Sequence, residues 1–216
     1  MAQNNGSREQ ILARVRQAIS TPAPMRPSAH PGPIFAPVTN LLERFQSECA
    51  ANLMELMVTE DSAASVAAVQ QVLAGLPPGD IYVQDAPELR TLAEAWQDGR
   101  GVIWSSQGPA PENVQAGITL CEALVALTGS VAISSACGGR TGSIVPPCHI
   151  ILAHMDQLVP DLESALARLQ QAAAAGSSYV GLITGSSRTA DIEKLLVLGA
   201  HGPRRLVVVL QREGIG

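Results

Sequence analysis

The sequence predicts an α/β fold in which a mostly parallel sheet is flanked by helices. The first observation is that short apolar strands alternate with helical segments through the first half of the chain. That alternation is typical of a parallel sheet covered on both faces. The second observation is the composition, because 46% of the 216 residues are hydrophobic and 15% are charged. A chain of this kind buries a large core instead of remaining disordered.

The first 38 residues are predicted to stand apart from a main domain that spans residues 39–216. Ile11, Leu12, Val15 and Ile19 recur at helical spacing, with Ser7 as the expected N-cap. Six prolines follow between positions 22 and 37, and such a density excludes a helix or a central strand. We therefore expect a tethered helix that docks on the domain or on a second copy, which would make a homo-oligomer.

The main domain is predicted to begin with three helix and strand pairs. The expected helices cover residues 39–54, 61–76 and 86–96, and the expected strands cover 55–59, 80–84 and 101–105. Thr39 or Asn40 caps the first helix and Asp61 or Ser62 the second, since short polar side chains accept hydrogen bonds from the first helical N–H groups.

The second half of the chain is predicted to contain short strands joined by tight turns. Glycines and prolines break residues 117–154 into apolar runs, which favour a hairpin around residues 128–130 and a glycine-rich connector after it. Beyond it we expect a helix at 160–175, a buried strand at 178–184, a helix at 190–199 and a core strand at 204–210. The helix at 190–199 has Ile192, Leu195 and Leu196 on one face and Gly199 as its C-cap.

Charge and cysteine spacing exclude several classes of function. The net charge of -5, without a basic run, argues against nucleic acid or an anionic membrane surface as the partner. Cys49, Cys121, Cys137 and Cys148 form no C-x-x-C pair, so they predict buried thiols instead of a zinc or iron–sulfur site. No stretch approaches the roughly 18 apolar residues of a membrane span. We expect a soluble, cytoplasmic protein.

The segment "TGSSRTAD" is the first candidate for a ligand site. A strand that ends in glycine and small hydroxyl residues before a helix exposes N–H groups that favour an anion. The candidate binding residues are Gly185, Ser186, Ser187, Arg188, Thr189 and Asp191. Arg188 can hold a carboxylate or phosphate with two parallel hydrogen bonds. The alternative is an ordinary helix cap with Arg188 as a solvated surface charge.

Two further stretches are weaker candidates. Thr128, Gly129 and Ser130 form a turn that can expose N–H groups as an oxyanion hole does, although hairpin geometry alone also explains such a turn. His201 is a candidate general acid or base, or a cap of the preceding helix. His149 and His154 are five positions apart on one predicted strand, so they face opposite sides and make a poor metal pair.

The stretch "TGSSRTADIEKLLVLGAHGPRRLVVVL" resembles the C-terminal signature of the lactate utilization protein C family, the LUD-domain proteins of LutC/YkgG type. "GITLCEALVALTGSVAI" and "IVPPCHIILAHMDQLVPDLESAL" are similar to the family's two preceding blocks, so the resemblance covers residues 39–216. Two positions depart from the family pattern. Ser186 stands where the family usually has proline, and Leu127 where many members carry glutamate.

The resemblance implies a fold similar to the NagB/RpiA/CoA-transferase group. It also implies participation in the oxidation of L-lactate to pyruvate, alongside partner proteins that carry the iron–sulfur clusters, with no cofactor on this chain. In that hypothesis Arg188 pairs the carboxylate of a small organic acid, and His201 is the nearby acid or base. Two alternatives stay open: an autonomous isomerase or acyl-CoA-transferase-type enzyme, and a non-catalytic assembly or regulatory module.

Overall fold

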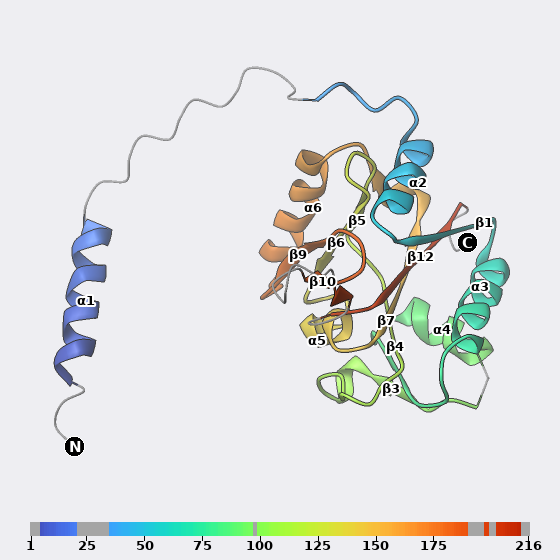
Figure 1. Ribbon diagram of the computed structural model, residues 1–216, viewed down its shortest axis with the longest axis horizontal. Coiled ribbons are helices and arrows are strands. Elements are labelled where there is room, and N and C mark those ends of the chain that lie inside the picture. Colours follow the sequence, from blue (N-terminus) through green and yellow to red (C-terminus); the bar gives the residue numbers. More distant parts are fainter. Residues whose placement is uncertain (1–4, 21–34, 97–98, 190–196, 199–201, 213–216) are drawn as a thin grey trace. The chain divides into compact units, whose positions relative to one another are not determined.

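Six parallel strands form the central sheet of the computed structural model (Figure 1), which describes residues 5–20, 35–96, 99–189, 197–198 and 202–212. The strands are Glu55–Thr59 (β1), Ile81–Val83 (β2), Val102–Trp104 (β3), Ala116–Thr119 (β4), Cys148–His154 (β7) and Arg205–Gln211 (β12). Their order across the sheet is β1-β12-β7-β4-β2-β3, and every neighbouring pair is parallel. The predicted α/β class with a mostly parallel sheet is therefore confirmed.

The middle strands are mostly apolar because both faces of the sheet are buried. In β7, Ile150 and Leu152 belong to one core cluster, whereas Ile151 and Ala153 belong to another. All four side chains are almost completely buried. Successive side chains of a strand point to opposite faces, so a continuous apolar run is what a strand covered on both sides requires.

Two helices cover the first face of the sheet, as predicted. They are α3 (Ser62–Ala74) and α4 (Pro87–Ala95). The Asp61 side chain accepts a hydrogen bond from the N–H of Ala64 and so caps the start of α3. Val69, Leu73 and Leu89 pack from these helices against the sheet and are fully buried.

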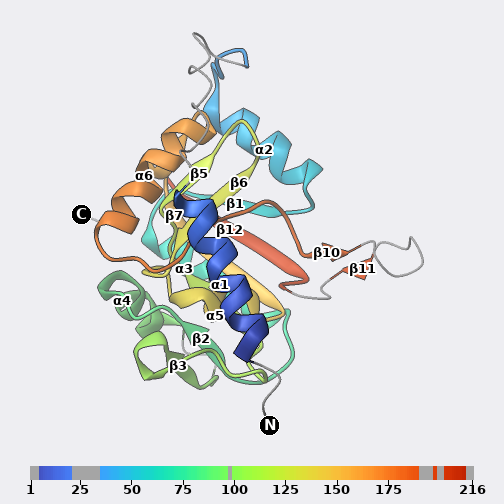
Figure 2. The same cartoon turned by 90° about the vertical axis from the view of Figure 1, so that its left-hand side faces the viewer.

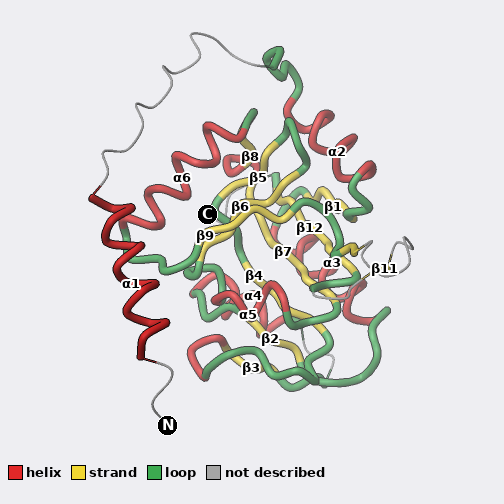
Figure 3. Tube along the Cα trace, turned by 60° about the vertical axis from the view of Figure 1, so that its left-hand side comes forward, coloured by secondary structure: helices red, strands yellow, loops and turns green. Residues whose placement is uncertain are grey.

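A second, smaller sheet covers the other face, and this layer was not predicted. It consists of Leu158–Val159 (β8), Ala123–Val125 (β5), Ser130–Ser134 (β6) and Val180–Ile183 (β9), in the order β8-β5-β6-β9. Its inner face packs on the central sheet together with α2 (Leu41–Ala51), and its outer face carries α6 (Leu162–Ala174). Figure 3 shows α6 next to the strands of the smaller sheet. The layers are thus helix, sheet, sheet and helix.

Several short elements complete the described chain. They are η1 (Ser105–Gln107), α5 (Gly139–Ile144), η2 (Met155–Gln157), β10 (Arg188–Thr189) and β11 (Val197–Leu198). Figure 2 shows β10 and β11 at the edge of the molecule, to the right of that view. They pair antiparallel with each other.

Local predictions in the main domain were wrong at three places. The glycine-rich segment expected to be a connector contains the short helix α5. The strand at 178–184 exists as β9, but it lies at the edge of its sheet, and Val180 and Leu182 are exposed, not buried. The helix expected at 190–199 lies mostly outside the described residues, and at Val197–Leu198 the structure has a strand instead.

The N-terminal helix α1 runs over Asn5–Ser20, so Ser7 lies inside the helix and is not its N-cap. The chain divides into two compact units, Met1–Ala36 and Pro37–Gly216. Ile11, Val15 and Ile19 of α1 are exposed. Within the described residues, no helix is both long and apolar enough to cross a membrane.

Candidate functional site

The loop after β9 lies at the amino ends of β1 and β12. Ser186 Oγ donates to the carbonyl oxygen of Leu53, two residues before β1, at 3.1 Å. The N–H of Ser187 donates to the carbonyl oxygen of Pro203, two residues before β12, at 2.9 Å. Two of the donors that the sequence assigned to an anion therefore already have acceptors within the protein.

The hairpin turn between β5 and β6 reaches the same end of the molecule. Gly129 has φ 63°, a left-handed conformation that favours glycine. Its N–H donates to the carbonyl oxygen of Val125 at 2.9 Å, so it is not the exposed oxyanion donor that the turn suggested. A Cβ atom on Gly129 would lie 2.7 Å from Cβ of Glu48, so the turn also packs tightly against α2.

A chain of three hydroxyl groups joins the two predicted segments. Thr128 Oγ1 lies 2.7 Å from Ser130 Oγ, which in turn lies 2.7 Å from Thr184 Oγ1. Ser130 and Thr184 are 54 positions apart in sequence. Each hydroxyl has one proton, and the two hydrogen bonds use two of the three protons, so one O–H group is left to donate to a ligand. Ser130 is buried, whereas Thr184 is exposed.

Helix α2 supplies polar side chains that the sequence did not point to. Arg44 Nη2 donates to the carbonyl oxygen of Leu127 at 3.2 Å and forms an ion pair with Glu48 at 2.7 Å. Asn52 Nδ2, just after α2, donates to the carbonyl oxygen of Thr128 at 3.1 Å. These contacts hold the turn in place. No local pattern reveals them, because they join residues 83 and 76 positions apart.

The remaining candidate residues are only partly within the described structure. Asp191 and His201 lie outside the described residues. The backbone of Arg188 and Thr189 forms β10, whereas their side chains lie outside the described part. The site that the structure brings together therefore consists of Thr128, Gly129 and Ser130 with residues 184–187. Its groups are hydroxyls and backbone atoms, which suit binding through hydrogen bonds more than proton transfer.

The cysteines lie in the core, as the sequence predicted. Burial raises the pKa of Cys49 to about 12 and that of Cys137 and Cys148 to about 11, and it raises the pKa of Cys121 as well. A thiol with a raised pKa is a weak nucleophile at neutral pH. In the part of the chain that the structure describes, no three His, Cys, Asp or Glu residues are grouped to hold a metal ion.

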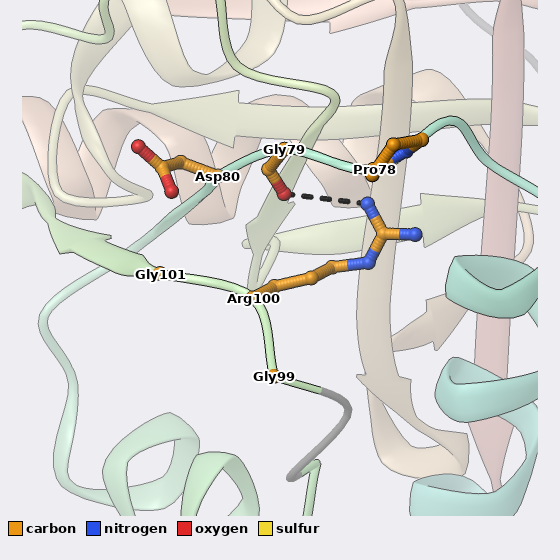
Figure 4. A pocket seen from close by; sticks show the side chains of 6 residues that line it. All are labelled: Pro78, Gly79, Asp80, Gly99, Arg100 and Gly101. Carbon is orange, nitrogen blue, oxygen red and sulfur yellow. Dashed lines mark hydrogen bonds between the residues drawn. The ribbon is translucent and has the colours of Figure 1, made fainter.

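A small pocket at the amino ends of β2 and β3 has a structural explanation (Figure 4). Its volume is about 180 Å³. Arg100 Nη2 donates to the carbonyl oxygens of Leu73 and Leu76, at 2.9 and 3.1 Å, so Arg100 caps the end of α3. Figure 4 shows the Asp80 carboxylate pointing away from the Arg100 guanidinium. We assign no ligand to this pocket.

The comparison with known proteins confirms the resemblance seen in the sequence. The family model of the LUD domain matches residues 110–211. Lactate utilization protein C of Bacillus licheniformis is 32% identical over 55% of this chain, and that match spans about half, 54%, of the relative. Lactate utilization protein C of Bacillus subtilis (strain 168) is 27% identical over 79% of this chain and 78% of the relative. Uncharacterized protein YkgG of Escherichia coli (strain K12) is 25% identical over 94% of this chain and 97% of its own length.

A solved structure supports the fold. The crystal structure of a DUF162 family protein from Deinococcus radiodurans matches with a TM-score of 0.62 and 19% identity, over 79% of this chain and 95% of that chain. At this identity the likeness shows the fold alone.

Proposed function

We propose that this LUD-domain protein is a LutC-like component of L-lactate utilization and acts in the cytoplasm with partner proteins that carry iron–sulfur clusters. The observation that carries the proposal is the match to relatives named lactate utilization protein C, which in Bacillus subtilis extends over 78% of the relative. The four cysteines are buried, and no three His, Cys, Asp or Glu residues in the described part of the chain are grouped to hold a metal ion, which supports placing the clusters on partners.

The role of this chain within that process is to bind a small organic acid. The hydroxyl chain of Thr128, Ser130 and Thr184 provides one hydrogen-bond donor at the junction of the two loops. Arg188 supplies the positive charge for the carboxylate and Thr189 a further hydroxyl donor. Asp191 orients Arg188 or the turn, and His201 is the acid or base if a proton moves. Glu48 of α2 lies beside this turn, since a Cβ atom on Gly129 would be 2.7 Å from Cβ of Glu48.

Growth on lactate tests the physiological role. We expect a host strain that lacks this gene to lose growth on L-lactate as the sole carbon source and to keep growth on pyruvate, since the proposed step precedes pyruvate. A plasmid copy of the wild-type gene should restore growth on L-lactate. Unimpaired growth of the deletion strain on L-lactate would contradict the proposal.

Ligand binding is tested by thermal denaturation with L-lactate, pyruvate, phosphate and CoA. A ligand present at about 100 times its Kd stabilises the fold by roughly 2.7 kcal/mol. For a chain of this size, each kcal/mol of stabilisation raises Tm by about 2–4 °C. We expect a rise in Tm with L-lactate or pyruvate, lost in Arg188→Ala and kept in Arg16→Ala, which removes an arginine from the separate unit Met1–Ala36. An equal rise in Tm in both variants would show that Arg188 does not belong to the site.

The exposed apolar side chains of α1 suggest self-association through this helix. Ile11, Val15 and Ile19 are 61%, 47% and 78% exposed, and an amphipathic helix is usually stabilised by packing that apolar face. We expect the full chain to form a homo-oligomer and a chain without residues 1–36 to be monomeric, as measured by light scattering. Ile11→Ser with Val15→Ser should have the same effect as the deletion. An unchanged mass in both variants would rule out this helix as the contact.

A further inference from the structure

A cavity of about 290 Å³ lies at the opposite end of the parallel strands from the loops described above. One wall is the loop that follows β3 and contains Ser105 and Gly108. The other wall is the turn between β6 and α5, with Ser135 and Gly138. Because Ser105 comes directly after β3, the cavity is at the carboxyl end of the parallel strands. The candidate loops, in contrast, contact residues just before β1 and β12.

The strand order places a switch point at this end of the sheet. From β2 the chain passes through α4 to β3, its neighbour on one side, and then returns to β4, its neighbour on the other side. Chain connections therefore leave β2 and β4 in opposite directions. In open α/β sheets a crevice forms outside the carboxyl ends of such a pair, and ligands bind there.

The turn above this crevice is held by Gln84, the residue that follows β2. Gln84 Nε2 donates to the carbonyl oxygen of Ala136 at 2.8 Å, and the N–H of Leu120 donates to Gln84 Oε1 at 2.7 Å. Gly138 has φ 80°, and a Cβ atom there would lie 3.2 Å from Cβ of Gln84. The turn can therefore lie this close to the strand ends because residue 138 is glycine.

Tyr82 of β2 fixes the distance between the two walls. Its hydroxyl oxygen lies 2.9 Å from the carbonyl oxygen of Gly108 and 3.2 Å from that of Gly138. One proton serves one of these acceptors at a time, and the side chain is only 2% exposed. The base of the cavity is thus a buried, neutral phenol in contact with both walls.

Two serine hydroxyls on the walls accept backbone N–H groups. Ser105 Oγ accepts the N–H of Asp85 at 2.9 Å, and Ser135 Oγ accepts the N–H of Ser178 at 2.9 Å. Each oxygen uses one lone pair to accept a backbone N–H, and each hydroxyl keeps a rotatable proton that can be donated to an acceptor in the cavity. The lining contains no Asp, Glu, Lys, Arg or His among the described residues. A full charge placed there would have no counter-charge in the lining.

We propose that this cavity is a binding site for a small, uncharged, polyhydroxylated molecule. Its oxygens accept the protons of Ser105 and Ser135, and its own hydroxyls donate to the free lone pairs of the Gly108 and Gly138 carbonyls. A water occupies roughly 30 Å³ in the liquid, so the cavity takes about ten non-hydrogen atoms. This site is separate from the organic-acid site and does not depend on it.

Saturation-transfer NMR with xylitol as the probe tests the site. Xylitol has the expected size and is uncharged, and pentane-1,5-diol is the matched control that keeps the carbon chain but lacks the three inner hydroxyls. We expect transfer to xylitol and not to the diol. Binding should weaken about tenfold in Ser105→Ala with Ser135→Ala, because two hydrogen bonds are lost.

Two further variants keep the test decisive. Ser106→Ala removes the neighbouring serine of η1, which does not line the cavity, and should bind xylitol as the wild type does. Ala136→Trp adds bulk at an exposed position of the lining and should abolish transfer without disturbing the core. Absence of transfer in the wild type, equal transfer to the diol, or undiminished transfer in Ala136→Trp would each overturn the proposal. Displacement of xylitol by L-lactate would overturn the assignment of an uncharged ligand.

Discussion

Lowering the pH from 7 to 5 is expected to reduce the free energy of unfolding by about 2 kcal/mol through His149 alone. His149 is fully buried in β7, and burial lowers the pKa of its imidazole from 6.5 to about 4. Its Nε2 lies 2.9 Å from Thr119 Oγ1, and its Nδ1 has no hydrogen-bond partner among the described residues. The folded chain therefore holds this side chain neutral.

The direction of the effect follows from proton binding. Between pH 6.5 and about 4 the unfolded chain binds a proton at this histidine and the folded chain does not. The free energy of unfolding consequently falls by about 1.4 kcal/mol for each pH unit below 6.5, and the loss levels off near the folded pKa. Above pH 6.5 the histidine is neutral in both states and contributes no pH dependence.

Urea denaturation at pH 5, 6 and 7 measures this slope. His149→Gln removes the titrating group, so the variant should lose less stability between pH 7 and pH 5 than the wild type, by about 2 kcal/mol. Its stability at pH 7 is also expected to be lower, because the packing around a fully buried side chain changes. His154→Gln, at the other end of β7, is the control for histidine substitution. Equal slopes in the wild type and His149→Gln would show that burial does not suppress protonation at this site.

The central sheet was predictable because its chemistry is local. Residues 150–153 form an apolar run because alternate side chains enter two separate cores, and that pattern is visible without knowing the partners. The caps at Asn40 and Asp61 were predictable for the same reason, since each side chain accepts a hydrogen bond from an N–H three residues later.

The second sheet and helix α5 were not predictable because distant contacts determine them. Strand β9 pairs with β6, and a sequence window cannot reveal which apolar runs pair. Helix α5 has the sequence "GRTGSI", which contains few good helix formers. Its Gly142 packs where a Cβ atom would lie 2.9 Å from the Tyr82 ring, so tertiary packing holds this helix in place.

In the candidate site, too, local features were predictable and distant contacts were not. The sequence pointed to the hydroxyl residues at 128–130 and 184–187, and the structure joins them through hydrogen bonds. Sequence patterns could not show that the N–H groups of Gly129 and Ser187 have acceptors within the protein. Nor could they indicate that α2 packs against the turn, because helix and turn are more than 75 positions apart.

Replacing Gly129 by alanine is expected to lower the free energy of unfolding by about 3 kcal/mol. Two causes add. A non-glycine residue in the left-handed region costs roughly 1–2 kcal/mol, and φ at Gly129 is 63°. The new Cβ would also lie 2.7 Å from Cβ and 2.9 Å from the carbonyl carbon of Glu48, and overpacking of this kind costs roughly 1–3 kcal/mol.

Gly139→Ala separates the two causes, since Gly139 has a similar φ of 73° and a Cβ atom there would meet nothing within 4 Å. This control should lose only about 1 kcal/mol, the conformational part. Urea denaturation of both variants gives the difference, which measures the contact between the turn and α2. Equal losses would mean that α2 yields to the added methyl group. In that case Gly129 would be required by the backbone conformation of the turn alone, and the hydrogen bonds from Arg44 and Asn52 would be the contacts by which this region holds the turn.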